Sequence, residues 1–288
     1  MDASIFAGRE MAQAEAVPVA GGLAGVISTR SPGKLSPNED SAAVLCIAPR
    51  NGLLIVADGM GGGPAGDVAS RTAIESLIQS VAQRDDVFGT IREAILSGFE
   101  SANRWLVDQG AGSATTLVVA ELFHDSLRTY HAGDSTLLVI GPHGTLRKLT
   151  TAHSPVGYGI ESGLLDPDEA ILHKDRHLIS NLVGSRELYI EVGTALELQA
   201  ADTVLLASDG LFDNLHLREI IEFARCGTPT QAAETLHAAA QARMLQGSDH
   251  APSKPDDLTV LVYRRDPSTT PCASSSSGSQ SQSQPSRD

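Results

Sequence analysis

The most constraining feature of this sequence is an apolar run that ends in an aspartate and a group of glycines. Residues 53–57 read Leu-Leu-Ile-Val-Ala, and Asp58 and Gly59 follow directly. An apolar run of this length, bounded by turn residues, predicts a buried β-strand. Its end places a carboxylate in a turn where glycines let the backbone approach a ligand closely. A buried carboxylate is costly unless it is paired, and a metal ion is a common partner.

The composition of the 288-residue chain limits the classes of protein that it can belong to. Hydrophobic residues make up 41% of the chain, which is enough for a sizeable core. The 35 acidic residues outnumber the 21 basic ones, so the formal net charge is −14. This balance argues against a nucleic-acid partner, which requires a basic face, and is compatible with a site that collects divalent cations. No apolar run approaches the ~20 residues of a membrane span, so we expect no membrane association.

The N-terminus and the cysteines bear on the cellular compartment. The first residues include both acidic and basic side chains and precede only a mild apolar stretch, unlike a signal peptide. Cys46, Cys226 and Cys272 are odd in number, far apart in the chain and without a CxxC spacing. We therefore expect reduced thiols and a cytoplasmic protein.

Strand and helix patterns occur in blocks along the chain. We expect strands at residues 22–28, 41–48, 52–57, 115–122, 127–132, 135–140, 193–199, 203–207 and 257–263, and helices at residues 64–84, 88–108, 166–169, 216–225 and 229–245. Meandering strands in two blocks, with helices grouped in pairs between them, predict an α+β fold with antiparallel sheets. From residue 266 onward the chain is rich in Ser and Gln, which predicts a disordered tail.

Acidic residues recur in one context, at a strand end or in a tight turn. The motifs are Asn38-Glu39-Asp40, Asp58-Gly59, Gly133-Asp134-Ser135, Ser208-Asp209-Gly210 and Asp256-Asp257. A single Asp-Gly pair is more often only a turn, but two of these motifs directly follow long apolar runs. Oxygen ligands of this kind suit hard cations such as Mg²⁺ or Mn²⁺. Several carboxylates around two such ions form a hydrolytic centre that activates water.

The glycines after the first strand also allow a second interpretation, as a dinucleotide-binding loop. Gly61, Gly63 and Gly66 form a GxGxxG pattern between a strand and a helix, and Asp85-Asp86 follows about 20 residues later. In that motif the acid ends a second parallel strand, but no strand pattern precedes this acidic pair. The strands and helices also do not alternate. Dinucleotide binding therefore stays a remote alternative.

The ordered set of motifs resembles the metal-dependent protein phosphatases of the PP2C (PPM) family. The resemblance covers residues 22–265 and rests on Asn38-Glu39-Asp40, Asp58-Gly59-Met60-Gly61-Gly62, Ser113-Ala114-Thr115-Thr116, Gly133-Asp134-Ser135, His153-Ser154, Ser208-Asp209-Gly210 and Asp256-Asp257. It implies two packed antiparallel β-sheets flanked by pairs of antiparallel α-helices. We therefore expect an N-terminal extension over residues 1–21, a PP2C-like phosphatase domain over 22–265 and a tail over 266–288.

The resemblance also implies which residues bind metal. Asp58 is expected to bridge two Mn²⁺ or Mg²⁺ ions. The Gly59 carbonyl and Glu39, through water, are expected to serve the first ion. Asp209 and Asp256 are expected to serve the second.

Two further acids complete the implied centre. Asp134, together with Asp209, corresponds to the pair that holds a third ion in many family members. Asp40 corresponds to the acid that orients metal-bound water. That water is expected to attack the phosphorus of phosphoserine or phosphothreonine directly, without a phosphoenzyme. The implied partners are a phosphorylated protein and an opposing Ser/Thr kinase, and we expect a monomer.

Three positions depart from the family pattern. Where the family usually has an Arg before its first motif, this chain has Leu35, and the adjacent Lys34 is the candidate phosphate-binding residue, as a point charge only. The His that often follows DGMGG, a proposed acid for the leaving group, is Gly63, and the usual Asn after the last metal acid is Asp257. These changes leave open a catalytically weak or inactive relative that binds a phosphoprotein as a regulatory module. Retention of the metal carboxylates favours an active phosphatase.

Overall fold

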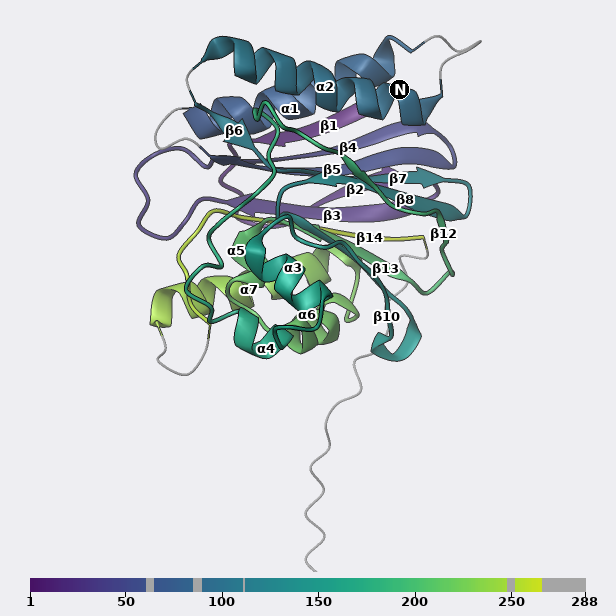
Figure 1. Ribbon diagram of the computed structural model, residues 1–288. Coiled ribbons are helices and arrows are strands. Elements are labelled where there is room, and N and C mark those ends of the chain that lie inside the picture. The colour runs from purple at the N-terminus through teal and green to yellow at the C-terminus, as the bar shows by residue number, and fades with distance from the viewer. Residues whose placement is uncertain (61–64, 85–89, 111, 248–251, 266–288) are drawn as a thin grey trace, which may run out of the picture.

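The computed structural model describes residues 1–60, 65–84, 90–110, 112–247 and 252–265 (Figure 1). Several positions from the sequence analysis lie outside the described residues. They are Gly61 and Gly63 of the glycine pattern, the acidic pair Asp85-Asp86, Cys272 and the tail over 266–288.

Two antiparallel β-sheets form the centre of the protein. The first sheet has the order β1 (Asp2–Ala7), β4 (Asp40–Ala48), β5 (Asn51–Met60), β7 (Leu117–Phe123), β8 (Ser126–Ala132) and β11 (Glu191–Val192), with β6 (Ala114–Thr115) on β5 and β12 (Leu196–Glu197) on β8. The second sheet has the order β10 (Leu146–Leu149), β9 (Thr136–Ile140), β13 (Thr203–Ala207), β14 (Leu258–Arg264), β3 (Gly22–Thr29) and β2 (Glu15–Val19).

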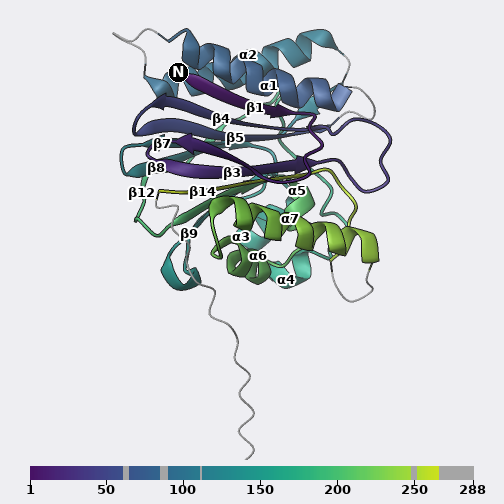
Figure 2. The ribbon, with the colours of Figure 1, turned by 180° about the vertical axis from the view of Figure 1, so that it is seen from behind.

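Helices cover the outer face of each sheet. The helices α1 (Ala65–Ala82) and α2 (Ile91–Gln109) lie side by side on the first sheet (Figures 1 and 2). The second sheet is covered by α5 (Asp209–Phe212), α6 (Leu217–Ala224) and α7 (Pro229–Gln246), and the short helices α3 (Pro155–Glu161) and α4 (Pro167–Ala170) lie on the same side of the molecule (Figure 2). The expected fold, two packed antiparallel sheets flanked by helices, is confirmed.

The apolar run at residues 53–57 becomes the inner strand β5. Leu54 and Val56 lie in the core between the two sheets. Leu53 and Ile55 lie in the second core, between the first sheet and its helices. Because both faces of this strand are buried, its sequence is continuously apolar and does not alternate.

The sequence analysis missed several short elements at the edges of the sheets. The strand β1 pairs with β4 and β2 pairs with β3, so the sheets extend into the segment expected to be an N-terminal extension. Both are edge strands, in which few side chains are buried. Pro18 is tolerated in β2 because a residue on a sheet edge needs no N–H to donate to a neighbouring strand. The strand β10 and the helices α3 and α5 were also not expected.

Among the cysteines of the described residues, Cys46 is a free thiol, as expected. The third cysteine, Cys272, lies outside the described residues.

Within the described ranges, no helix combines the length and the apolar character that crossing a bilayer requires.

Candidate metal centre

The strand ends that carry the acidic motifs meet at one end of the two sheets. In the first sheet, β4 and β5 pair so that Asp40 lies directly opposite Asp58. In the second sheet, the Ser208 N–H at the end of β13 donates to the Thr259 carbonyl of β14 at 3.2 Å. The Ser208 hydroxyl donates to Asp40 Oδ2 at 2.7 Å, which connects the two sheets. Residues that are more than 160 positions apart in the chain are thereby brought to one site.

The carboxylates at this site repel one another. Burial raises the pKa of Asp58 well above its usual range, and the negative charges of Asp40, Asp209, Asp256 and Asp134 raise that pKa further. Burial, followed by the charge of Asp209, likewise raises the pKa of Asp256 to about 6. Acids whose ionised forms destabilise one another are stabilised by a bound cation, so Asp58 lies where a cation is most favourable.

Buried carboxylate oxygens without a hydrogen-bond partner indicate where such a cation fits. They include Glu39 Oε1, Asp40 Oδ1, Asp134 Oδ1 and Asp209 Oδ1. An unpaired buried polar atom costs ~1–3 kcal/mol, so a native fold that keeps several in one place has a use for them. Hard carboxylate oxygens are the ligands that Mg²⁺ and Mn²⁺ prefer, and the residues present therefore fit these ions.

Glycines allow the backbone segments of the centre to approach closely. A Cβ atom on Gly59 would lie 2.0 Å from the Gly66 carbonyl oxygen, and one on Gly66 would lie 2.3 Å from Glu39 Oε1. A Cβ atom on Gly210 would lie 2.1 Å from the Asp257 carbonyl oxygen. No side chain fits at these positions, so the Asp-Gly motifs are close contacts of β5, α1 and β14 and not merely turns.

The comparison with known proteins agrees with this geometry. The sequence model of a family described as protein phosphatase 2C matches residues 32–246. The chain belongs to the protein phosphatase 2C family. The family resemblance inferred from the ordered motifs is thus confirmed.

Relatives of this phosphatase 2C chain are found among bacterial proteins. The protein phosphatase PhpP of Streptococcus pneumoniae is 32% identical over 193 residues, which are 64% of this chain and 77% of PhpP. The Mycobacterium tuberculosis serine/threonine phosphatase PstP/Ppp has a similar structure, with a TM-score of 0.67, 28% identity and coverage of 84% of this chain and 97% of that chain. A structure of the PstP catalytic domain in complex with two manganese ions gives a TM-score of 0.66, 27% identity and coverage of 84% and 96%.

Two departures from the phosphatase 2C pattern compensate each other. The Lys34 ammonium donates to Glu39 Oε2 and to Asp257 Oδ2, each at 2.6 Å. Asp257 also accepts the N–H groups of Glu39 and Ser31, each at 2.7 Å, so it fixes the first acidic motif. The lysine neutralises the acid that replaces the usual Asn. Leu35, at the position of the usual Arg, is 96% exposed. Phosphate binding by Lys34 stays a prediction, since two carboxylates already hold its ammonium.

The turn that carries Asp134 is fixed by His153. The main-chain N–H of Gly133 donates to the ring nitrogen Nδ1 of His153 at 3.2 Å, and the main-chain N–H of His153 donates to the Gly133 carbonyl at 3.0 Å. Asn181 Nδ2 also donates to Nδ1, at 2.8 Å, so the ring proton lies on Nε2 and is donated to Glu191 Oε2 at 3.3 Å. Burial lowers the pKa of His153 and keeps the ring neutral. A fully buried His153 therefore positions Asp134 through Gly133, a role that the sequence did not suggest.

His131, His153 and Glu191 lie close enough together to resemble a metal site. The hydrogen bonds argue against that interpretation. His131 Nε2 donates to the Thr151 carbonyl at 2.9 Å, and His153 Nε2 donates to Glu191. Both nitrogens that face Glu191 thus carry protons, whereas a metal requires their lone pairs. We interpret this cluster as a hydrogen-bonded support of the turn at Asp134.

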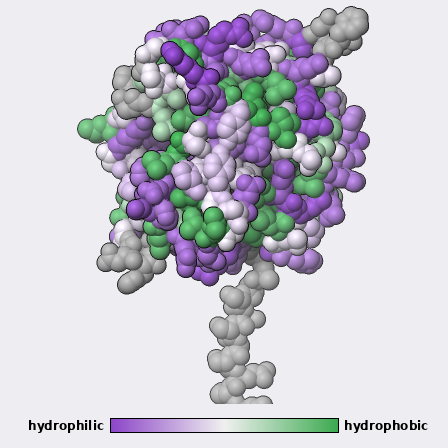
Figure 3. All heavy atoms as spheres, in the orientation of Figure 1, coloured by the Kyte–Doolittle hydropathy of each residue, from purple (hydrophilic) through white to green (hydrophobic). Residues whose placement is uncertain are grey.

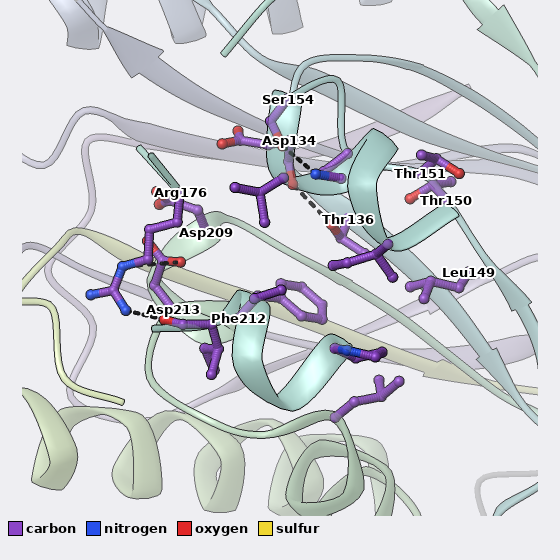
Figure 4. Close-up of a pocket in the computed structure, with 18 of the residues that line it drawn as sticks. Asp134, Thr136, Leu149, Thr150, Thr151, Ser154, Arg176, Asp209, Phe212 and Asp213 are labelled. Carbon is purple, nitrogen blue, oxygen red and sulfur yellow. Dashed lines mark hydrogen bonds and ion pairs between the residues drawn. The ribbon is translucent and has the colours of Figure 1, made fainter. Parts of the chain in front are cut away.

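A cavity of about 310 Å³ adjoins the candidate metal centre. Figure 4 shows Asp134, Asp209 and Asp213 on one side of it and Leu149 on the other. The apolar remainder of the lining comes from β10 and the helices α3 to α6, and includes Val156, Ile160, Ile171, Phe212 and Leu215. The sequence analysis did not identify this cavity or Asp213, because the lining residues come from segments that only the fold brings together.

Proposed function

We propose that this phosphatase 2C chain hydrolyses phosphoserine and phosphothreonine in proteins with two bound Mn²⁺ or Mg²⁺ ions. The observation that carries the proposal is the convergence of the acidic motifs at one end of the two sheets. Asp40 lies opposite Asp58, and the Ser208 hydroxyl connects Asp40 to the turn that carries Asp209. Buried carboxylate oxygens without a hydrogen-bond partner are gathered there. The manganese-bound structure of PstP and the phosphatase PhpP support the same activity. Because the acids are retained, an active phosphatase is favoured over an inactive module that only binds a phosphoprotein.

The proposal assigns ligands to each ion. Asp58, the Gly59 carbonyl and, through water, Glu39 would hold the first ion. Asp58, Asp209 and Asp256 would hold the second. When bound, such ions supply an activated water and neutralise the charge of the phosphate. The unpaired oxygens of Glu39 and Asp209 support this assignment.

Two further acids act on the substrate side of this centre. Asp40 is fixed by the Ser208 hydroxyl on Oδ2, and its unpaired Oδ1 is the atom that would orient the attacking water. Asp134, held in place through Gly133 and His153, would bind a third ion together with Asp209. The apolar cavity beside Asp134 offers space for a side chain of the protein substrate next to its phosphorylated residue.

The proposal extends to the partners and the location of the protein. We propose a monomeric, cytoplasmic enzyme that opposes a Ser/Thr kinase. The net charge of −14 supports a protein substrate and not a nucleic acid. On the face seen in Figure 3, hydrophobic side chains lie among hydrophilic ones, as on the surface of a protein that is exposed to water.

Phosphate release from a phosphothreonine peptide is expected to require a divalent metal ion. The full chain is stripped with EDTA, dialysed, and assayed alone and with Mn²⁺ or Mg²⁺. We expect release only with added metal, because the acids supply ligands but no activated water of their own. Equal release before and after exhaustive chelation would contradict the proposal. Peptide binding and Mn²⁺ binding without any release would favour the regulatory module.

A further inference from the structure

A lysine ammonium lies among the acids assigned to the second ion. Lys254 Nζ is 2.7 Å from Asp209 Oδ2, 2.8 Å from Asp213 Oδ2 and 3.0 Å from Asp256 Oδ2. An ammonium group has three N–H donors, and each of them has a carboxylate partner here. The sequence analysis did not single out Lys254, although it lies only two residues before Asp256.

The fold holds the main chain of Lys254 in this position. Its N–H donates to Asn214 Oδ1 and its carbonyl accepts from Asn214 Nδ2, both at 2.8 Å. Asn214 is fully buried, and its Nδ2 also donates to the Gly210 carbonyl at 2.9 Å. One amide side chain therefore connects Lys254 to the turn that carries Asp209. The lysine is built into the centre and is not a surface residue that happens to reach it.

The oxygens of Asp256 are both in use. Oδ1 accepts the Asp257 N–H at 3.0 Å, and Oδ2 is held by Lys254. Asp209 differs, because its Oδ2 is held by Lys254 while its Oδ1 is buried without a partner. An ion that binds between Asp209 and Asp256 can bind the free Oδ1 of Asp209 directly. To bind Asp256 Oδ2, it must displace the Lys254 ammonium.

We propose that Lys254 is an internal counter-cation that competes with the second metal ion for Asp256. In the absence of metal, the ammonium stabilises three acids that repel one another. When the second ion binds, the ammonium has to move away from Asp256. As long as the ammonium stays within a few ångströms, its positive charge repels the ion. This inference rests on the proposed function, because it takes Asp209 and Asp256 as metal ligands.

The other lysine of the centre does not compete in this way. Lys34 holds Glu39 Oε2 but leaves Glu39 Oε1 unpaired, and its second partner, Asp257, is not an assigned ligand. The first ion thus finds one oxygen of Glu39 free, whereas both oxygens of Asp256, a ligand of the second ion, are already in use. The chain should therefore bind its two ions in separate steps, with the second step weaker.

The experiment measures Mn²⁺ binding by isothermal titration calorimetry on the full, EDTA-stripped chain. Lys254→Met removes the ammonium, and Lys34→Met is the matched control, because it removes the same charge from the other side of the centre. In the Lys254→Met protein, we expect the weaker Mn²⁺ site to bind about tenfold more tightly or better, because a repelling charge a few ångströms away is gone. We expect a clearly smaller change in the Lys34→Met protein.

Thermal unfolding in EDTA provides a second measurement. The Lys254 substitution is expected to raise the Mn²⁺ affinity but to lower the stability of the metal-free protein. We expect Lys254→Met to lower the unfolding temperature of the metal-free protein, since Asp209 and Asp256 lose their ammonium partner while Asp213 keeps the more distant Arg176, at 4.0 Å. Lys254→Gln, which keeps a hydrogen-bond donor without the charge, serves in its place if the Met variant does not fold. The same rise in Mn²⁺ affinity is expected for it.

Two outcomes would overturn the role of Lys254. One is unchanged or weaker Mn²⁺ binding in the Lys254 variants, which would make the lysine a support of the ligands. The other is an equal gain in Lys34→Met, which would reduce the effect to net charge. Failure of every protein to bind Mn²⁺, with phosphate release that persists in EDTA, would overturn the proposed function itself and is distinct from both.

Discussion

Replacement of Asp58 by Asn should lower phosphate release by about a hundredfold to a thousandfold, on the order of ten times the 10–100-fold that loss of an outer partner of a metal ligand costs. Asp58 is the acid assigned to both ions, and the charges of four neighbouring acids converge on it. Asn keeps the size of the side chain but removes the negative charge. Both ions therefore lose a ligand of the correct charge, while the removal of repulsion among the acids leaves the fold intact. The measurement is the initial rate of phosphate release at saturating Mn²⁺.

A matched change at the surface provides the control. Asp125 is a half-exposed acid in the turn between β7 and β8, where it pairs with Arg50 and Arg265. The rate of the Asp125→Asn protein should stay close to that of the unchanged protein. A rate for Asp58→Asn within a few-fold of the unchanged protein, with a normal circular dichroism spectrum in both variants, would remove Asp58 from the centre of the mechanism.

The second large effect is expected for Gly59→Ala. The added Cβ atom would lie 2.0 Å from the Gly66 carbonyl oxygen and 2.8 Å from the Glu39 carbonyl oxygen, both backbone atoms that cannot move separately. The end of β5 must then separate from the start of α1. We expect the free energy of unfolding to fall by about 3 kcal/mol, as for severe overpacking, and Mn²⁺ binding to weaken. Urea denaturation and calorimetric titration measure these two effects.

The control for this change is Gly159→Ala in α3. There the added Cβ atom meets Leu165 Cδ1 at 2.7 Å, which is the end of a flexible side chain that can rotate away. The unfolding free energy of this variant should change by less than about 1 kcal/mol, and its Mn²⁺ affinity should not change. Similar losses in the two variants would show that the contact between Gly59 and Gly66 has no special role.

The inner strands that lead to the centre could be predicted, because a strand that is buried on both faces has a continuously apolar sequence. Residues 53–57 and 204–207 are continuously apolar, since helices cover the outer face of each sheet and the other sheet covers the inner face. The edge strands β1 and β2 bury few side chains, so no comparable pattern marks them. A prediction from periodicity therefore finds the inner strands and misses the edges.

The acids of the centre could be predicted from their places at strand ends, but the contacts of the basic residues could not. Lys254 and Lys34 each form contacts across the fold, with acids 45 and 223 residues away among their partners. No local pattern gives such a contact. The departure at Asp257 was visible in the sequence, whereas its compensation by Lys34 required the structure. The same holds for His153, whose two bonds to Gly133 connect residues 20 positions apart.

The most direct test of the central claim is anomalous diffraction at the manganese absorption edge from crystals soaked in Mn²⁺. We expect two manganese peaks, one on either side of the Asp58 carboxylate. One should lie beside Glu39 and the Gly59 carbonyl, and the other beside Asp209 and Asp256. Peaks only at other sites, such as the cluster of His131, His153 and Glu191, with none in contact with Asp58, would contradict this claim.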